Sequence, residues 1–410
     1  MPESPSAESR LLLCCTRSDF DAEAQTGIET ILRQGIDWAS LLASALRHSL
    51  LPLLYDRLQG LDASRIPPEV IAGLKGAYYA NLLRNQRLGA DLAEAVAALR
   101  QEGVEALVLK GGALARTVYA GPAQRPMVDL DLLVRPGQMA RAGVVLEALG
   151  YQTSRSEPAH MVAFQQRFGG GLEWLRSRGD RTTRLDVQFD LVGVDWCWDA
   201  FPVEPGALWE AARPLDLDGT PALQLSPEDT LIHLCLHPAL HHGYHCPLIG
   251  YVDMDRLVAA SEPALSWTSL VERVERFRVR TVVYYGLQCA RRLLGTPVPA
   301  DVQLALKPGA AQLRILQALA PLTQETVLDA TSTLPRGVRQ VLLYAALVDR
   351  ARDAVSIVRG ILFPDEEWLA VRYSLVSREQ VWRYRLVHPL RVARAFLSGL
   401  TRPLIESSLE

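Results

Sequence analysis

The chain has 410 residues, of which 22% are charged and 49% are hydrophobic, so it is long enough to bury a core in two or three domains. Its formal net charge of −3 argues against a dedicated nucleic-acid-binding protein, although a local basic groove is compatible with that balance. No uninterrupted apolar run reaches the roughly 18 residues of a transmembrane helix, and the six cysteines form no CxxC pair. These features predict a reduced, cytoplasmic setting and no insertion into a membrane.

The first hundred residues are predicted to be helical. Apolar residues follow a helical spacing from Leu11 to about Gly60. The stretch 69–102 is rich in alanine and leucine and contains no proline, which predicts one long helix that ends near Gly103. Residues 1–103 are therefore expected to form a helical N-terminal region.

A different pattern begins at Val104 and continues to about residue 200. Short apolar or period-two runs predict strands, glycine and proline mark loops, and helices connect the strands. The expected order is strand 104–109, helix 113–119, strand 128–134, helix 136–149, a short strand at 151–153, a strand pair over 164–178 and strand 184–190. Residues 104–200 are therefore predicted to be an α/β domain with a mixed β-sheet.

The remainder, residues 201–410, is predicted to be a helical C-terminal domain. After Pro202 the pattern turns helical. The sequence Ser226-Pro227-Glu228-Asp229 combines a cap residue, a proline in the first turn and acidic residues at the start of a helix. The whole chain is thus expected to have an α+β fold in which helical regions flank a central sheet.

Two aspartates on strand 128–134 are candidate metal ligands. Asp129 and Asp131 share one face of this strand, about 7 Å apart, and the leucines occupy the other face. Their like charges are costly to bury, and a hard cation such as Mg²⁺ or Mn²⁺ would remove that cost. Metal-assisted nucleotidyl transfer needs a further carboxylate on a neighbouring strand. Asp186, on strand 184–190, is the natural third carboxylate.

The order of these motifs resembles that of the polymerase-β-type nucleotidyltransferases. More closely, Leu109-Lys110-Gly111-Gly112-Ala113-Leu114, then Arg125, then residues 129–134 resemble a group known as uncharacterised nucleotidyltransferases, which occur in bacterial natural-product and polysaccharide gene clusters. The resemblance extends to residues 225–229, His233, His237, Asp253 and residues 362–373. It implies that Gly111 and Gly112 lie at the triphosphate of an NTP and that Asp129, Asp131 and Asp186 surround Mg²⁺.

Three further positions belong to the predicted site. Lys110 either contacts a phosphate or lines the edge of the motif. Arg125 either binds a phosphate or pins its loop to the sheet. Gln188 stands two residues after Asp186, where the group often has histidine, so it is placed in the substrate cleft without a proton-transfer role.

Histidines recur every four residues at His233, His237, His241 and His245. On a continuous helix the first three would share one face, as zinc ligands can. Pro238 weakens such a helix, however, and no carboxylate or cysteine completes an obvious site. Structural histidines are the simplest explanation. The functional alternative is a polar face that lines the cleft, with His233 or His237 touching substrate or paired with Asp253.

The C-terminal region is rich in arginine and contains aromatic residues between the arginines. Such a segment can bind RNA through phosphate contacts and stacking. More often it is the solvated face of a terminal helix whose aromatic residues pack inward, and that interpretation is preferred here. The residues are Arg372, Arg378, Arg383, Arg385, Arg391 and Arg394, with Tyr373, Trp382 and Tyr384.

Together these features predict a Mg²⁺-dependent nucleotidyltransferase. It would move a nucleoside monophosphate from an NTP to a hydroxyl of a small molecule, a peptide natural product or a saccharide. Two alternatives stay open. One is a toxin-like nucleotidyltransferase that acts on tRNA or on a protein, which a basic groove beside the cleft would favour. The other is a catalytically silent binding protein with the same fold.

Overall fold

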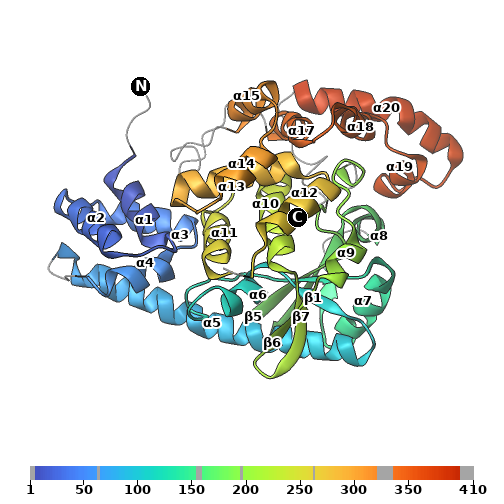
Figure 1. Ribbon diagram of the computed structural model, residues 1–410. Helices are drawn as coiled ribbons and strands as arrows, with labels where there is room; N and C mark the ends of the chain where they lie inside the picture. Colours follow the sequence, from blue (N-terminus) through green and yellow to red (C-terminus); the bar gives the residue numbers. More distant parts are fainter. Residues whose placement is uncertain are drawn as a thin grey trace.

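The computed structural model describes residues 5–61, 65–153, 159–193, 197–261, 264–320 and 336–397. Within these ranges a seven-stranded mixed sheet is flanked by helices from both ends of the chain (Figure 1). The predicted α+β fold, with helical regions before and after the sheet, is confirmed. No helix in the described ranges is long and apolar enough to cross a membrane.

Five helices precede the sheet. Asp21 and Asp37 cap the second and third of them with their carboxylates, as short polar residues do at a helix start. The predicted long helix is confirmed as α5, which covers 34 residues and runs along one side of the molecule (Figure 1). The bounds are α1 (Ala7–Thr16), α2 (Ala22–Arg33), α3 (Trp38–Arg47), α4 (Leu51–Leu58) and α5 (Pro68–Gln101).

The strands follow the order β3-β4-β5-β2-β1-β7-β6 across the sheet. The central strand β2 is antiparallel to β1 and parallel to β5, and β1 is parallel to β7. The outer pairs β3–β4, β4–β5 and β6–β7 are antiparallel. The bounds are β1 (Ala106–Val108), β2 (Leu130–Val134), β3 (Gln152–Thr153), β4 (Gly171–Arg178), β5 (Arg181–Gln188), β6 (Arg213–Leu217) and β7 (Thr220–Gln224).

The two faces of the sheet pack into different hydrophobic clusters. Val108 and Leu132 face a cluster that includes α5 residues such as Leu92. Leu107 and Leu133 face a second cluster, which joins the N-terminal helices to the helices that follow the sheet. Because side chains alternate along a strand, Asp131 lies on the same face as Leu133, away from α5.

In the described ranges thirteen α-helices follow β2 along the chain, and one short helix connects β1 to β2. Ser226 accepts a hydrogen bond from the backbone N–H of Asp229 and caps α10, as the sequence predicts. The bounds are α6 (Lys110–Thr117), α7 (Met139–Ala148), α8 (Ala159–Phe168), α9 (Pro205–Glu210), α10 (Pro227–His242), α11 (Ile249–Ala260), α12 (Trp267–Arg276), α13 (Arg280–Leu294), α14 (Ala300–Leu306), α15 (Ala310–Leu319), α17 (Arg336–Leu347), α18 (Ala351–Leu362), α19 (Glu366–Arg372) and α20 (Arg378–Leu397).

Three local predictions are wrong. The first half of the expected strand pair over 164–178 belongs to helix α8, and strand β4 begins only at Gly171. The region after Pro202 is not purely helical, because the hairpin β6–β7 extends the sheet there. The helix expected at 113–119 begins earlier, so that Gly111 and Gly112 lie inside the first turn of α6. The division of the chain at residues 103 and 200 stays a prediction.

Candidate active site

Strand pairing brings two of the predicted carboxylates together. Asp131 on β2 and Asp186 on β5 are register partners in a parallel pair, so both side chains project from the same face of the sheet. The Asp131 side chain is only 5% exposed. Burial, together with the neighbouring charge of Asp131, raises the pKa of Asp186 to about 7. Two adjacent buried carboxylates of this kind require a compensating positive charge.

Lys110 supplies that charge. Its Nζ donates a hydrogen bond of 2.7 Å to Oδ1 of Asp131. Burial alone would lower the pKa of Lys110, but the carboxylates of Asp131 and Asp186 outweigh burial and raise the pKa above its ordinary value. The lysine backbone has a φ of 43°, in the left-handed region where residues other than glycine are strained. Lys110 was predicted either to contact a phosphate or to line the edge of the motif. To contact a phosphate, its ammonium group would have to leave the ion pair with Asp131.

Asp129 lies just before β2 rather than within it. Burial and the charge of Asp131 raise the pKa of Asp129 as well, while Lys110 and Arg125 lower it. The three predicted aspartates are therefore close enough to affect one another electrostatically. They form one acidic group around the end of Lys110.

Two further side chains belong to the same face of the sheet. The Gln188 amide donates to Oδ2 of Asp186 over 2.7 Å and to Oδ1 of Asp131 over 3.3 Å, so it bridges the two carboxylates. Glu173 on β4 is the antiparallel register partner of Asp186 and forms an ion pair of 3.1 Å with Arg184. The sequence analysis missed Glu173. Pairing the period-two runs on either side of the turn at Gly179 would have placed it opposite Asp186.

The donor set has the chemistry that Mg²⁺ prefers, because carboxylate oxygens are its usual protein ligands. Within the described ranges, however, no three Asp, Glu, His or Cys side chains converge closely enough to hold a metal as they stand. Lys110 and Gln188 donate to the oxygens that a cation would need. The ammonium group of Lys110 thus occupies the position beside Asp131 where a metal cation would bind. Asp131 and Asp186 are the residues best suited to hold such a cation.

The start of α6 lies next to these carboxylates. Leu109 donates its backbone N–H to the carbonyl oxygen of Asp131, and Lys110 then begins the helix. No side chain caps α6, so its first N–H groups are available for an anion. Both glycines are also required by packing. A Cβ on Gly111 would lie 2.9 Å from Cγ of Met127, and one on Gly112 would lie 2.9 Å from Cγ1 of Val108.

The loop between α6 and β2 is held from two sides. On one side, the buried amides of Asn81 and Asn85 on α5 donate to the carbonyl oxygens of Pro122, Ala123 and Arg125. On the other side, Arg125 forms a bidentate pair of 2.8 Å with Asp253 on α11. Of the two predicted roles for Arg125, this geometry favours pinning the loop. The anchor is helix α11 rather than the sheet.

Helix α10 carries the histidines and is continuous through Pro238. The carboxylate of Asp253 accepts hydrogen bonds from Arg125 and Tyr119, which does not support the alternative in which His233 or His237 pairs with Asp253. Burial first, and then the charge of Lys110, lower the pKa values of His233 and His237 well below the ordinary value. Both imidazoles are therefore neutral, and both lie within electrostatic reach of Lys110.

The histidines do not assemble a zinc site in the described part of the chain. His237 and His242 instead share a contact of 3.2 Å between their Nε2 atoms. The ring of His241 stacks near His237 at 4.9 Å between centroids, against the Gly193 backbone. His233, His237 and His241 thus form a row of neutral imidazoles along α10, called the histidine ladder here, and the charge of Lys110 acts on each of them.

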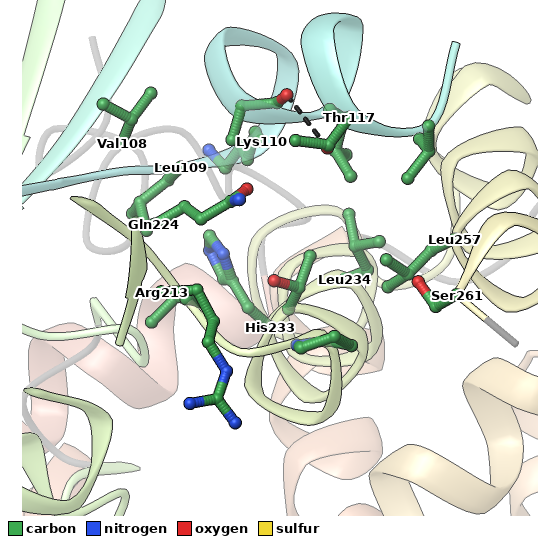
Figure 2. Close-up of a pocket in the computed structure, with 16 residues that line it drawn as sticks. Val108, Leu109, Lys110, Thr117, Arg213, Gln224, His233, Leu234, Leu257 and Ser261 are labelled. Carbon is green, nitrogen blue, oxygen red and sulfur yellow. Dashed lines mark hydrogen bonds between the residues drawn. The ribbon is translucent and has the colours of Figure 1, made fainter. Parts of the chain in front are cut away.

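A cavity of about 110 Å³ lies beside Lys110, between α6, β7, α10 and α11. Figure 2 shows Lys110 and His233 approaching it from different elements, with Gln224 and Arg213 from the β6–β7 hairpin. The hairpin that the sequence analysis missed therefore contributes polar side chains next to the predicted site.

The fold and this site define a nucleotidyltransferase-like protein, with paired carboxylates on a mixed sheet beside the glycine-containing start of a helix. The chain belongs to the family described as "Uncharacterised nucleotidyltransferase", whose match covers residues 34–295, more than half of its length.

No curated protein matches the chain. Among solved structures, the chain is similar to an antigenic nucleotidyltransferase-like protein from Paracoccidioides brasiliensis, with 15% sequence identity and a TM-score of 0.34. The match covers 53% of this chain and 91% of the other. At this TM-score, the similarity supports no conclusion about individual residues.

Proposed function

We propose that the protein is a Mg²⁺-dependent nucleotidyltransferase in which an acceptor hydroxyl attacks the α-phosphorus of an NTP, so that the nucleoside monophosphate is transferred and pyrophosphate is released. The observation that supports this most directly is the pairing of Asp131 with Asp186 beside the uncapped start of α6. The pair supplies oxygen ligands for a divalent cation, and the helix start supplies N–H groups for phosphate. The acceptor would be a small molecule, a peptide natural product or a saccharide in a bacterial biosynthetic pathway, in the cytoplasm.

In this proposal each residue has a defined task. Asp131 and Asp186, joined by Asp129, would hold the cation, which when bound neutralises the triphosphate and lowers the pKa of the attacking hydroxyl. The backbone N–H groups at Gly111 and Gly112 would bind phosphate oxygens. Lys110, no longer needed as the counterion of Asp131, would donate to a phosphate oxygen instead.

The acceptor side would be formed by α10. His233 is buried and neutral next to the cavity of Figure 2, so its imidazole could orient an acceptor hydroxyl by accepting a hydrogen bond from it. Gln188 would keep the Asp186 carboxylate oriented through its amide.

The test is incubation of the protein with each labelled NTP, Mg²⁺ and a bacterial cell extract, followed by mass analysis for an added nucleotide. Transfer should be lost in Asp131→Asn and Asp186→Asn. A matched control is Asp218→Asn, because Asp218 lies in the β6–β7 turn and its side chain is 80% exposed. Transfer that survives both site variants would refute the assignment, and so would failure of all four NTPs to bind in millimolar Mg²⁺.

A second candidate function is a catalytically silent binding protein with this fold. The Lys110–Asp131 ion pair favours it, because the pair satisfies the carboxylate without any metal. Calorimetric titration with NTP in Mg²⁺ and in EDTA separates the two functions. Binding that is unaffected by EDTA would favour the silent protein. Action on tRNA lacks comparable support, since the arginine-rich α20 lies away from the sheet (Figure 1).

A further inference from the structure

Helix α20 is buried on one side and carries exposed apolar side chains on the opposite side. Val381, His388 and Val392 are buried against the neighbouring helices. On the opposite side, Trp382, Leu386 and Leu390 follow one another at intervals of four residues, which places them along one stripe. Their exposed fractions are 57%, 71% and 69%. A stripe of large apolar side chains on an outer helix face is unusual unless it contacts something.

Exposed apolar residues also lie on and just after helix α18. Val355 and Val358 on α18 and Phe363 just after it are 67%, 40% and 61% exposed. Phe363 lines two grooves at once. One groove, of about 270 Å³, also contains Trp382 and Leu386, and the other, of about 750 Å³, contains the two valines. The six residues thus border one continuous surface, called the α18–α20 surface here.

Positive charge accompanies this surface. Helix α20 contains five arginines and a single acidic residue, Glu379, in a chain whose net charge is −3. Arg383 is exposed and directly follows Trp382. Arg385 is paired with Glu366 over 3.1 Å, and its guanidinium lies 5.9 Å from the Trp382 ring. The surface therefore combines aliphatic side chains, one tryptophan and arginines at its edge.

We propose that the α18–α20 surface docks on a membrane that contains anionic phospholipids. Aliphatic side chains and tryptophan can enter the boundary between head groups and acyl chains, while arginines bind the anionic head groups. The helix would lie in the plane of the interface and would not span it. This inference is independent of nucleotidyl transfer, since none of its residues belongs to the candidate active site.

Two other occupants fit the same surface less well. A second copy of the chain would place arginine-rich helices against each other across a two-fold axis, where like charges repel. RNA would need several exposed rings for base stacking. Trp382 offers one, but Tyr373 and Tyr384 pack against each other at 4.7 Å and Arg391 covers both. The leucines along the centre of the stripe also have no charge or hydrogen-bond donor with which to bind a phosphate backbone.

The proposal is tested by co-sedimentation of the full chain with two kinds of vesicle. One contains phosphatidylcholine alone, and the other contains phosphatidylcholine and phosphatidylglycerol in equal parts. We expect binding to the anionic vesicles, weakened by salt. Leu386→Glu with Leu390→Glu, and separately Arg383→Glu, should each weaken binding about fivefold or more. The control is Leu304→Glu, since Leu304 is 74% exposed on the distant helix α14.

Several results would overturn the inference. These are no sedimentation with anionic vesicles, equal binding to both vesicle types, or unchanged binding in the leucine and arginine variants. Light scattering that shows a wild-type dimer and a monomeric leucine variant would identify a second copy as the occupant instead. RNA binding that is lost in Arg383→Glu, without vesicle binding, would identify RNA. Circular dichroism and urea unfolding confirm that each variant is folded before these comparisons.

Discussion

Replacement of Lys110 by methionine is expected to destabilise the protein when no divalent cation is present. Methionine keeps most of the apolar stem but removes the ammonium group, which lies 2.7 Å from Oδ1 of Asp131. Asp131 is 5% exposed at its side chain and adjoins Asp186 in the sheet, so the variant leaves like charges without their counterion.

The expected size of the effect follows from this burial. Removing one partner of a buried ion pair costs about 3–5 kcal/mol. We expect the lower end, about 3 kcal/mol, because Lys110 remains 17% exposed and water can partly solvate the vacated position. In an Asp131→Asn background the cost of Lys110→Met should fall to about 1 kcal/mol, since the amide no longer carries the charge that the ammonium compensates.

Urea unfolding in EDTA measures these free energies, and the same series in millimolar Mg²⁺ tests whether a cation replaces the ammonium group. Mg²⁺ should stabilise Lys110→Met more than it stabilises the wild type. Lys75→Met is the matched control, because Lys75 is exposed on α5. The reasoning is refuted if Lys110→Met unfolds like the wild type in EDTA, or if its cost is the same with Asn at position 131.

Three other predictions concern stability, and urea unfolding measures each of them. Arg125→Met should cost about 3–5 kcal/mol by leaving the carboxylate of Asp253, 2% exposed, without its cation, and a cost below about 1 kcal/mol would contradict the pairing. Gly112→Ala should destabilise the protein by about 1–3 kcal/mol, because the added Cβ would contact Val108. At Gly76 a Cβ meets nothing within 4 Å, so Gly76→Ala should stabilise the helix by about 0.5–1 kcal/mol. Equal effects of the two variants would refute the packing argument. Burial lowers the pKa of His241 to about 3, so the unfolded chain binds a proton below about pH 6.5 that the folded protein excludes. The contribution of His241 to the free energy of unfolding should therefore be complete above pH 6.5 and should fall by up to about 1.4 kcal/mol per pH unit toward pH 3. His241→Asn should reduce that slope, and an unchanged slope would contradict the prediction.

Local signals in the sequence identified much of the fold. The Ser226 cap and the proline-free stretch of α5 gave correct helices, because capping and helix propensity act within a few residues. The β6–β7 hairpin was not predicted, and its first strand contains Pro214. Proline is tolerated at a sheet edge, and β6 is an edge strand. The Asp218-Gly219 turn, with both residues at positive φ, was the overlooked signal.

The roles of the predicted site residues stay predictions, and the structure shows contacts among them that the sequence did not indicate. Alternation along β2 and β5 correctly placed Asp131 and Asp186 on comparable faces, and strand pairing then made them neighbours. The partners of charged side chains depend on elements distant in sequence, so periodicity could not show that Arg125 binds Asp253, 128 positions later. Nor could it show that Lys110 turns toward Asp131, since that direction depends on a left-handed backbone at one residue.

Helix α5 determines which side of the site can adapt. A helix of 34 residues is about 50 Å long and behaves as a stiff rod. Asn81 and Asn85 fasten the loop before Asp129 to the middle of this rod, so the conformational entropy of that loop is lost when the chain folds rather than when a ligand binds. A nucleotide would meet a preorganised surface on the sheet side. Any adjustment to acceptors of different shape would then be made by the histidine ladder of α10, which makes that helix the place to alter when a new acceptor is wanted.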